Sequence, residues 1–255
     1  MRIVCRDQKT HEWYQARLGK VTASNIASAM AKLERASGEK KKGDWAKAHD
    51  AYVRDIAWEL ITRVPTDHYV SKAMDIGTAY EGEARIEYWQ AVGEEVEQTG
   101  FVLHPTIDFL GCSPDGLRSG RGIEIKVPLL KTHENYIMDD VVPEEYQPQM
   151  QCNMLCCEMP EWDFVSYAPP DVYPDFPDDL RLFIKPLKAD PEQHRLMEEA
   201  ATATMEHAVA VVEGLLKRFP SLGQKREMPK PISDPLAETM LTEADLDRFS
   251  KQIGL

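Results

Sequence analysis

Two carboxylates and a lysine lie close together near the middle of this 255-residue chain. Asp115 belongs to the run Ser-Pro-Asp-Gly at residues 113–116, and Glu124 and Lys126 follow it in a Glu-Ile-Lys run after eight intervening residues. Two acids and an amine in this arrangement could hold a divalent metal ion and position a water molecule for attack on a phosphodiester. The plainer interpretation is a turn at Asp-Gly followed by the solvated face of an edge strand, since acid-x-Lys alone is a common pattern.

The segment between the two acids is predicted to form a β-hairpin with a two-residue turn at residues 119–120, Ser-Gly. Counting outward from this turn pairs residue 116 with residue 123 and places Asp115 directly opposite Glu124, with Cβ atoms about 4.5–5.5 Å apart. Like charges this close repel each other unless a cation lies between them. Strand alternation puts Lys126 on the same face as Glu124, while the opposite face carries the apolar row Ile123, Ile125 and Val127.

Oxygen ligands without cysteine or histidine favour Mg²⁺ or Mn²⁺ over Zn²⁺ at such a site. A lysine beside the ion could orient or deprotonate a water molecule, or hold a phosphate oxygen. The three groups therefore predict a metal-dependent hydrolytic site on one face of a strand whose other face enters the core.

The composition is that of a soluble globular protein, with 43% hydrophobic and 29% charged residues. The chain has no apolar run long enough to cross a bilayer and its start lacks a secretory signal, so we expect a cytoplasmic protein with no membrane partner. Five cysteines without a Cys-x-x-Cys pair indicate neither a disulfide framework nor a zinc site. Cys152 and Cys156 have helical spacing and are predicted to face a core.

The net charge of −13 argues at first against a polyanionic partner, but the charge is unevenly distributed. Residues 1–60 contain twelve basic against eight acidic side chains, whereas the remainder contains 18 basic against 35 acidic ones. Phosphate contacts depend on the local field more than on the total charge. Phosphate-binding candidates, which could equally form a solvated basic loop, are Lys32, Arg35, Lys40, Lys41 and Lys42.

The periodicity predicts an α/β fold in which helices flank a central mixed sheet. A first helix, capped by Thr22 or Ser24, is expected to reach Leu33. Further helices are predicted at residues 44–62, 71–92, 143–157 and 191–218. Strands are predicted at residues 96–104, 110–112, 123–127 and 164–168.

The chain beyond residue 218 looks like a separate addition to a domain formed by residues 1–218. Four prolines between residues 219 and 235 predict an extended linker, and a capping pattern at Thr242 predicts a short helix ending near Ile253. This helical extension, within residues 219–255, could pack on the domain or on a partner.

Four sequence segments, in order, resemble the lambda-type exonucleases of phage recombination systems, the YqaJ-like branch of the restriction-endonuclease-like nucleases. Each segment alone is a weak signal, but their order and spacing across residues 13–168 are specific. The segments are WYQARLG at 13–19 with TAS at 22–24, GTAYE at 77–81, SPDG at 113–116 with EIK at 124–126, and YQPQMQ at 146–151.

The resemblance implies a restriction-endonuclease-like core and a Mg²⁺-dependent enzyme that acts on the ends of linear double-stranded DNA. Such enzymes remove mononucleotides from the 5′-ended strand and leave a 3′ overhang for recombination by strand annealing. A homotrimeric ring and cooperation with a single-strand annealing protein are also implied. The addition at residues 219–255 departs from the lambda-type pattern, so the resemblance does not define the outer surface of the ring or how a partner docks there.

The resemblance also implies roles for individual residues around two metal ions. Asp115 and Glu124 would be ligands, with the main-chain carbonyl of Ile125 as a further oxygen, and Lys126 would position or activate the attacking water. The other two candidates are Glu81, which would hold a metal ion or its water from across the cleft, and Gln149, which would orient the nucleophile or the phosphate. Spacing alone does not separate Glu81 from two acids on the same predicted helix, Glu83 and Glu87.

Three further residues match positions that grip the terminal 5′-phosphate in these enzymes, namely Arg17, Ser24 and Ser113. A guanidinium fork with hydroxyl groups suits a phosphate dianion physically. Taken individually, Arg17 could pair with a nearby acid, and Ser24 could be only a helix cap.

Two alternative functions remain open at this stage. The same nuclease core could belong to a structure-specific endonuclease or nickase, or the protein could bind DNA ends without cleaving them. The intact set of two acids and Lys126 favours an enzyme, since a binding module needs no lysine in a metal cleft.

Overall fold

The computed structural model describes residues 1–66 and 72–223, and the predicted final helix therefore lies outside the described residues. The strands are β1 Arg2–Cys5, β2 Val21–Thr22, β3 Phe101–Leu103, β4 Leu110–Cys112, β5 Gly116–Arg118, β6 Arg121–Lys126, β7 Glu161–Tyr167 and β8 Leu182–Lys188. The helices are α1 His11–Arg17, α2 Ile26–Met30, α3 Lys47–Thr62, α4 Lys72–Val92, α5 Leu130–Asp139, α6 Gln147–Cys157 and α7 Pro191–Arg218. Short 3₁₀ turns lie at Ala23–Asn25, Asp178–Leu180 and Pro220–Gly223.

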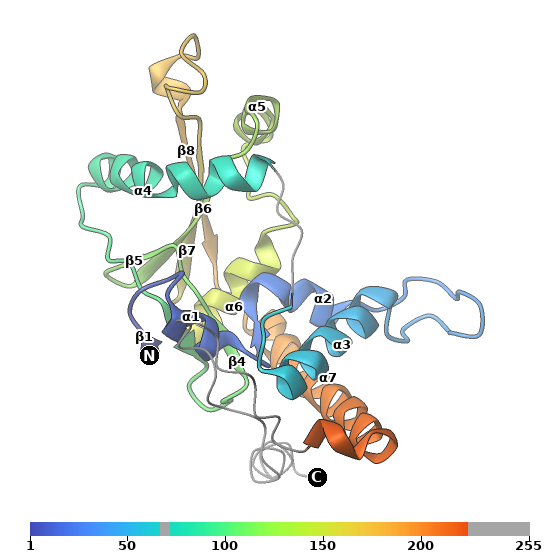
Figure 1. Cartoon of the computed structure of the whole chain (residues 1–255). Helices are drawn as coiled ribbons and strands as arrows, with labels where there is room; N and C mark the ends of the chain where they lie inside the picture. The colour runs from blue at the N-terminus through green and yellow to red at the C-terminus, as the bar shows by residue number, and fades with distance from the viewer. Residues whose placement is uncertain (67–71, 224–255) are drawn as a thin grey trace.

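The fold is α/β, as predicted, but its strands form two four-stranded sheets instead of one (Figure 1). The first sheet has the order β1-β3-β4-β2 and the second has the order β5-β6-β7-β8. Each sheet is mixed, because β2 runs parallel to β4 and β6 runs parallel to β7, whereas the other pairs are antiparallel. The chain passes directly from the first sheet to the second between β4 and β5, which is the segment that carries Asp115.

The predicted hairpin is β5–β6, and its register is confirmed from residue 116 paired with 123 to residue 118 paired with 121. Gly120 has a positive φ of 68° in the turn, a conformation that glycine adopts without strain. Gly122 lies against the ring of Trp162 on β7, where a Cβ atom would come within 2.3 Å of the indole. The two glycines therefore let the hairpin turn tightly and pack closely on its neighbour.

The predicted pairing of Asp115 with Glu124 is not part of this ladder, which ends at Gly116. In a continued ladder, the Ile125 N–H would bond to the carbonyl of Pro114. Instead, the Ile125 N–H donates to the Asp115 carboxylate at 2.7 Å, and the Pro114 carbonyl accepts from the side chain of Gln8. The aspartate thus ends the strand by using its own side chain.

The helix α4 covers the second sheet and carries Glu81 (Figure 1). It packs on β6, β7 and β8, and its residues Ala84 and Tyr88 join the apolar row of β6 in one buried cluster. Ile123, Ile125 and Val127 all belong to this cluster, which confirms the predicted apolar face. Because that face is buried, the opposite face of β6, which carries Glu124 and Lys126, is held in a fixed position.

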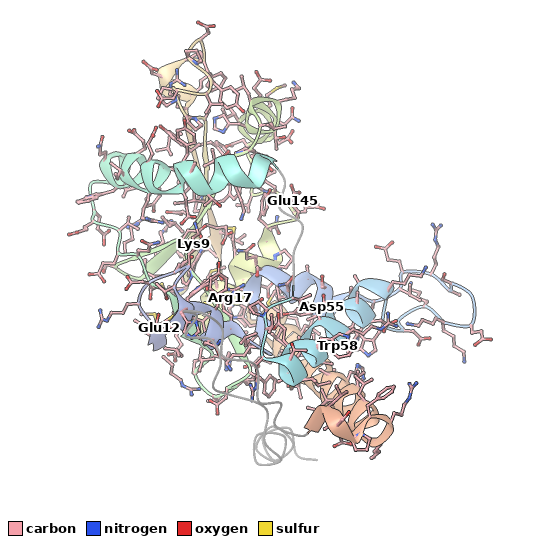
Figure 2. All side chains as sticks on the ribbon, viewed as in Figure 1. Lys9, Glu12, Arg17, Asp55, Trp58 and Glu145 are labelled. Atoms are coloured by element: carbon pink, nitrogen blue, oxygen red, sulfur yellow. The ribbon has the colours of Figure 1, made fainter. Side chains whose placement is uncertain are left out.

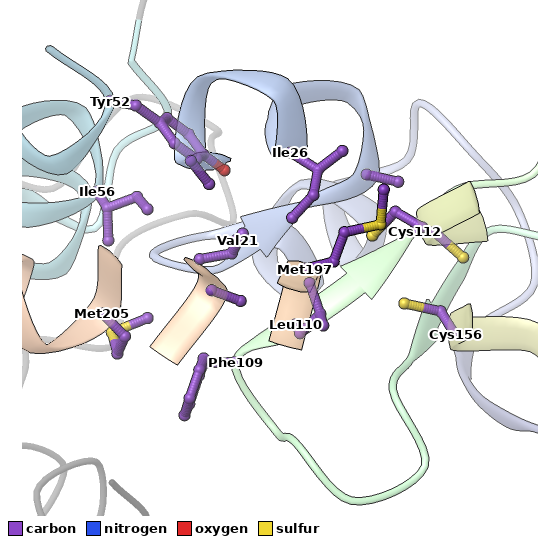
Figure 3. Close-up of a cluster of buried hydrophobic side chains, with 14 of the residues drawn as sticks. Val21, Ile26, Tyr52, Ile56, Phe109, Leu110, Cys112, Cys156, Met197 and Met205 are labelled. Atoms are coloured by element: carbon purple, nitrogen blue, oxygen red, sulfur yellow. The ribbon is translucent and has the colours of Figure 1, made fainter. Parts of the chain in front are cut away.

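A larger core lies between the first sheet and the helices α2, α3, α6 and α7 (Figure 3). Ile56 of α3 and Met205 of α7 both belong to this core, and Cys156 of α6 points toward Cys112. Cys152 and Cys156 are both buried in this core, as their helical spacing predicts. This packing anchors α6, whose first turns reach the active site.

The predicted and observed bounds of an element agree best where its apolar periodicity extends over many residues. Helix α7 spans the predicted residues, whereas α6 begins at Gln147 instead of residue 143. The first predicted helix is a 3₁₀ turn and a short α2 that ends at Met30, and Thr22 makes no side-chain capping bond to it. The sequence prediction missed β1, α1, β2, α5 and β8.

The basic residues 32–42 lie on the segment between α2 and α3, which projects from the body of the protein (Figure 1). Lys32 lies over the ring of Trp45 at 4.8 Å, and Lys40 forms an ion pair with Asp50 at 2.6 Å.

None of the helices that the structure describes has the length and apolar character needed to cross a bilayer.

Candidate active site

Glu124 is the most deeply buried carboxylate of the site, with only 1% of its surface exposed. Its Oε1 accepts a hydrogen bond from the Lys126 Nζ at 2.6 Å, and its Oε2 accepts one from the Asn153 Nδ2 at 3.0 Å. Asp115 approaches from the end of β5, with one oxygen bound to the Ile125 N–H. The structure therefore brings together the two acids and the lysine that the sequence singled out.

The two carboxylates place an excess of negative charge in a dry environment. Burial, followed by the neighbouring charge of Glu124, raises the pKa of Asp115 well above its ordinary value of 3.8. Burial also lowers the pKa of Lys126, but the adjacent Glu124 and Asp115 outweigh this effect, so that the Lys126 pKa is raised overall. One ammonium thus faces a buried glutamate and a half-buried aspartate, and a cation at the pair would relieve the remaining repulsion.

Glu81 lies on α4 beside Asp115 and is held by two cations. Its Oε1 accepts from Arg85 at 2.8 Å, and its Oε2 lies 3.4 Å from the Lys9 Nζ. Arg85 also donates to the main-chain carbonyl of Asp115 at 2.7 Å, which ties the helix to the strand end. The charge of Glu81 contributes to the raised pKa of Asp115.

The two competing acids of α4 face elsewhere. Glu83 accepts a hydrogen bond from the hydroxyl of Tyr167, and the charge of Glu87 acts on the same tyrosine. Among these three acids, Glu81 is therefore the one that approaches Asp115.

Gln149 lies in the first turn of α6 and is partly buried. It precedes Asn153 by four residues and therefore lies on the same face of the helix. Tyr146, at the start of α6, places its ring 4.9 Å from the Lys126 Nζ. The first turns of α6 thus form the wall of the site next to Lys126.

Sequence reasoning missed three side chains that hold the site together: Asn153, Arg85 and Tyr146. Asn153 follows Gln149 by four residues and Arg85 follows Glu81 by four, so helical periodicity could have identified both. Tyr146 lies inside one of the four matching segments.

The donor set fits a hard divalent ion that keeps part of its water shell. In the described part of the chain, no three acidic, histidine or cysteine side chains converge as a complete ligand set. Asp115 and Glu124 would supply two ligands, and Mg²⁺ is commonly bound by one or two carboxylates together with substrate phosphates and water. The main-chain carbonyl of Ile125, between Glu124 and Lys126, is available as a further oxygen.

Arg17 lines a pocket and contacts the hydroxyls of Ser24 and Ser113, the second of which lies two residues before Asp115. Arg17 donates to the Ser113 hydroxyl at 3.0 Å and lies 3.5 Å from that of Ser24, and its guanidinium stacks over the Trp13 ring at 4.4 Å. The Trp13 indole N–H donates to the same Ser113 hydroxyl at 2.9 Å. Burial lowers the pKa of Arg17.

The carboxylates of Asp55 and Glu59 line the same pocket, and the charge of Glu59 acts on the Arg17 guanidinium. The hydrogen bonds that Arg17 makes in the described structure go to serine hydroxyls and not to a carboxylate. Ser24 lies inside the 3₁₀ turn and does not cap a helix. Ser113 stands two residues before Asp115, so the pocket and the acid pair are about 6–7 Å apart along an extended chain.

An acid pair with an adjacent lysine on a sheet hairpin, faced by a glutamate from a covering helix, is the arrangement expected of a restriction-endonuclease-like nuclease. Residues 12–160 match the YqaJ-like viral recombinase domain. This match covers more than half of the chain, and the protein belongs to that family.

Solved structures agree with this assignment. The alkaline exonuclease LHK-Exo from Laribacter hongkongensis is 32% identical over 84% of this chain and all of its own, with a TM-score of 0.70. The complex of LHK-Exo with dAMP gives 33% identity, the same coverage and a TM-score of 0.72. A phage-related exonuclease from Haemophilus somnus 129PT shares the fold, with 16% identity over 77% of this chain and 96% of its own, and a TM-score of 0.60. A comparison with curated proteins gives no significant match.

Proposed function

We propose that this nuclease is a Mg²⁺-dependent 5′-to-3′ exonuclease that degrades the 5′-ended strand of linear double-stranded DNA to mononucleotides. The product would be a 3′ single-stranded overhang for recombination by strand annealing. The observation that carries the proposal is the acid pair with Lys126. Ser113, two residues before Asp115, binds the Arg17 guanidinium, which is suited to a phosphate.

Asp115, Glu124 and the Ile125 carbonyl would hold the metal, with Glu81 reaching an ion or its water from α4. Two Mg²⁺ ions are proposed, and Mn²⁺ could replace them because it accepts the same oxygen ligands. Such ions supply charge stabilisation for the incoming and departing oxygens of an in-line displacement. The raised pKa of Asp115 supports this assignment, since the pair lacks sufficient positive charge from the protein alone.

Lys126 acts in this proposal as a positive charge that positions the attacking water or a phosphate oxygen. Its raised pKa keeps it protonated beside Glu124 in the protein without metal, which favours positioning over proton abstraction in that state. Gln149, from the same side of the site, would orient the nucleophile or the phosphate.

The Arg17 pocket would select the end of the DNA. Arg17 would form charged hydrogen bonds with a terminal 5′-phosphate, and the hydroxyls of Ser24 and Ser113 would complete its ligation. An enzyme with a phosphate held next to its metal site would cut at one nucleotide from the end and release mononucleotides.

Several features beyond the site are proposed on the family resemblance. The protein would act in the cytoplasm as a homotrimeric ring around DNA and would cooperate with a single-strand annealing protein. The projecting basic segment between α2 and α3 could contact the phosphates of the duplex. Residues 219–255 could then pack on the nuclease domain or on a partner.

Digestion of matched linear duplexes tests the proposal. With Mg²⁺, a 5′-phosphorylated duplex should release mononucleotides faster than the same duplex with 5′-hydroxyl ends, and closed circular DNA should remain intact. Cleavage of the circles would favour an endonuclease or nickase. A lack of nucleotide release from any linear end, with retained binding to ends, would favour a non-catalytic end-binding protein.

A further inference from the structure

Lys9 lies in a turn between β1 and α1 and has a left-handed backbone conformation that is unusual for a lysine. Its φ is 61°, in the left-handed region that residues with a Cβ avoid. The other described non-glycine residues with positive φ are the C-caps of α3, α6 and α5, where this conformation ends a helix: Arg63, Glu158 and Asp140. Lys9 follows no helix but lies in the turn before α1, at a conformation that turns usually give to glycine or asparagine.

The loop around Lys9 is fixed to the chain segment that carries Asp115. The Gln8 side chain donates to the carbonyls of Pro114 at 2.7 Å and Thr99 at 2.9 Å. On the other side, the Thr10 hydroxyl caps α1 by accepting from the Trp13 N–H, and it also contacts the carbonyl of Asp7. The position of Lys9 is therefore set with respect to the acid pair.

The Lys9 side chain places an ammonium at the edge of the active site. Its Nζ lies 3.4 Å from the Glu81 Oε2, and 49% of the side chain is exposed. Glu81 already receives a shorter bond from Arg85 at 2.8 Å, so its charge is balanced without Lys9. Figure 2 shows Lys9 between α1 and α4, with Arg17 on the α1 side. The ammonium thus has donors left for a ligand that enters between these helices.

We propose that Lys9 binds an internal phosphate of the DNA strand being cut, on the Glu81 side of the site, while Arg17 holds the terminal phosphate. This inference rests on the proposed function, since it assigns a contact to the DNA substrate. A lysine is a compact charge on a flexible stem and suits a phosphate that must pass the site after each cleavage. A functional contact also gives a reason for keeping a strained backbone at a fixed position.

The competing explanation is that Lys9 only neutralises Glu81. The two explanations differ in their consequences for binding. A phosphate contact contributes to DNA affinity and to its salt dependence, whereas a counter-charge for Glu81 contributes to neither and competes with metal binding.

The test uses Lys9→Ala and Lys9→Gly, which remove the same amine but leave different backbone strain. Binding to a 5′-phosphorylated duplex is measured with Ca²⁺ in place of Mg²⁺, over a range of salt concentrations. Both variants should bind about fivefold more weakly. The slope of log affinity against log salt should fall by about 0.9, which is the loss of one phosphate contact. The melting temperature of Lys9→Gly should equal or exceed that of the wild type, because glycine accepts this φ.

Two control variants separate charge from backbone effects. Lys217→Ala removes an exposed lysine at the far end of α7, and Asp140→Gly makes the same backbone change at a positive φ of 50°. Both should keep the wild-type DNA affinity and salt slope. Unchanged affinity and slope in the two Lys9 variants, or tighter metal binding without a loss of DNA binding, would overturn the inference while the proposed function stands. If the wild type itself fails to bind DNA ends, the proposed function falls and this inference falls with it.

Discussion

Asn153 donates a hydrogen bond to Glu124 from the middle of α6, although the other end of its own amide has no partner. Its side chain is fully buried, and among the described residues its Oδ1 accepts no hydrogen bond. Gln151, two residues earlier, is buried to a similar degree but is fully bonded and faces away from the acids. The two amides therefore offer a matched pair of substitutions on one helix.

The structure predicts a smaller loss of stability for Asn153→Ala than for Gln151→Ala. Asn153→Ala loses a hydrogen bond to a charged group, worth about 1.5–3 kcal/mol, but it also removes an unsatisfied buried carbonyl that costs about 1–3 kcal/mol. With a small cavity added, the net loss should be about 1 kcal/mol. Gln151→Ala removes the partner of the Lys188 carbonyl, the Asp190 N–H and the His194 Nε2, which should cost about 2–5 kcal/mol.

For metal binding the order should be reversed, with the larger effect in Asn153→Ala. Asn153 fixes one oxygen of Glu124, and loss of a partner that orients a metal ligand typically weakens metal affinity by about 10–100-fold. Gln151 contacts neither acid, so its variant should keep the wild-type affinity. Urea unfolding in EDTA measures stability, and calorimetric titration with Mn²⁺ measures affinity. Wild-type Mn²⁺ affinity in Asn153→Ala, or an equal loss of affinity in Gln151→Ala, would refute this reasoning.

Three further predictions follow from the electrostatics of the site. The folded-state pKa of Asp115 is raised above 3.8, so the metal-free protein should lose stability as pH rises from 3.8 through the folded-state pKa. Asp115→Asn should remove this loss. Urea unfolding in EDTA from pH 4 to pH 8 measures both. Arg17→Ala should reduce the preference for 5′-phosphorylated over 5′-hydroxyl ends by about 10–100-fold, measured as the ratio of digestion rates, and an unchanged ratio would place the end-binding site elsewhere. Lys126→Ala should lower the cleavage rate by about 10²–10⁴-fold while DNA affinity in Ca²⁺ is retained, and a parallel loss of binding would contradict its assigned role.

The parts of the fold that sequence predicted well are those with local causes. The register of β5–β6 follows from a two-residue turn and strict alternation, and both are visible within twelve residues of sequence. The bounds of α7 follow from Asp190, which caps its first turn through two N–H groups, and from a long apolar period. In the same way, burial of Ile123, Ile125 and Val127 could be read from alternation alone.

The parts that sequence did not predict depend on contacts between distant segments. Asp115 leaves the ladder because Gln8, more than a hundred residues earlier, takes the carbonyl that a longer strand would have used. The division into two sheets depends on the parallel pairing of β6 with β7 across α5 and α6. The meeting of Arg17 with Ser113 was expected from family resemblance, since nothing in the local sequence joins residues 96 positions apart.

The central claim is that Asp115 and Glu124 together hold a divalent ion next to a phosphate bound by Arg17. The most direct measurement is a crystal structure of the protein with Mn²⁺ and a short 5′-phosphorylated duplex, in which anomalous scattering locates the metal. We expect an anomalous peak coordinated by both carboxylates, with the terminal phosphate on Arg17. Manganese bound away from this pair, or a DNA end held elsewhere with the two acids bare, would contradict it.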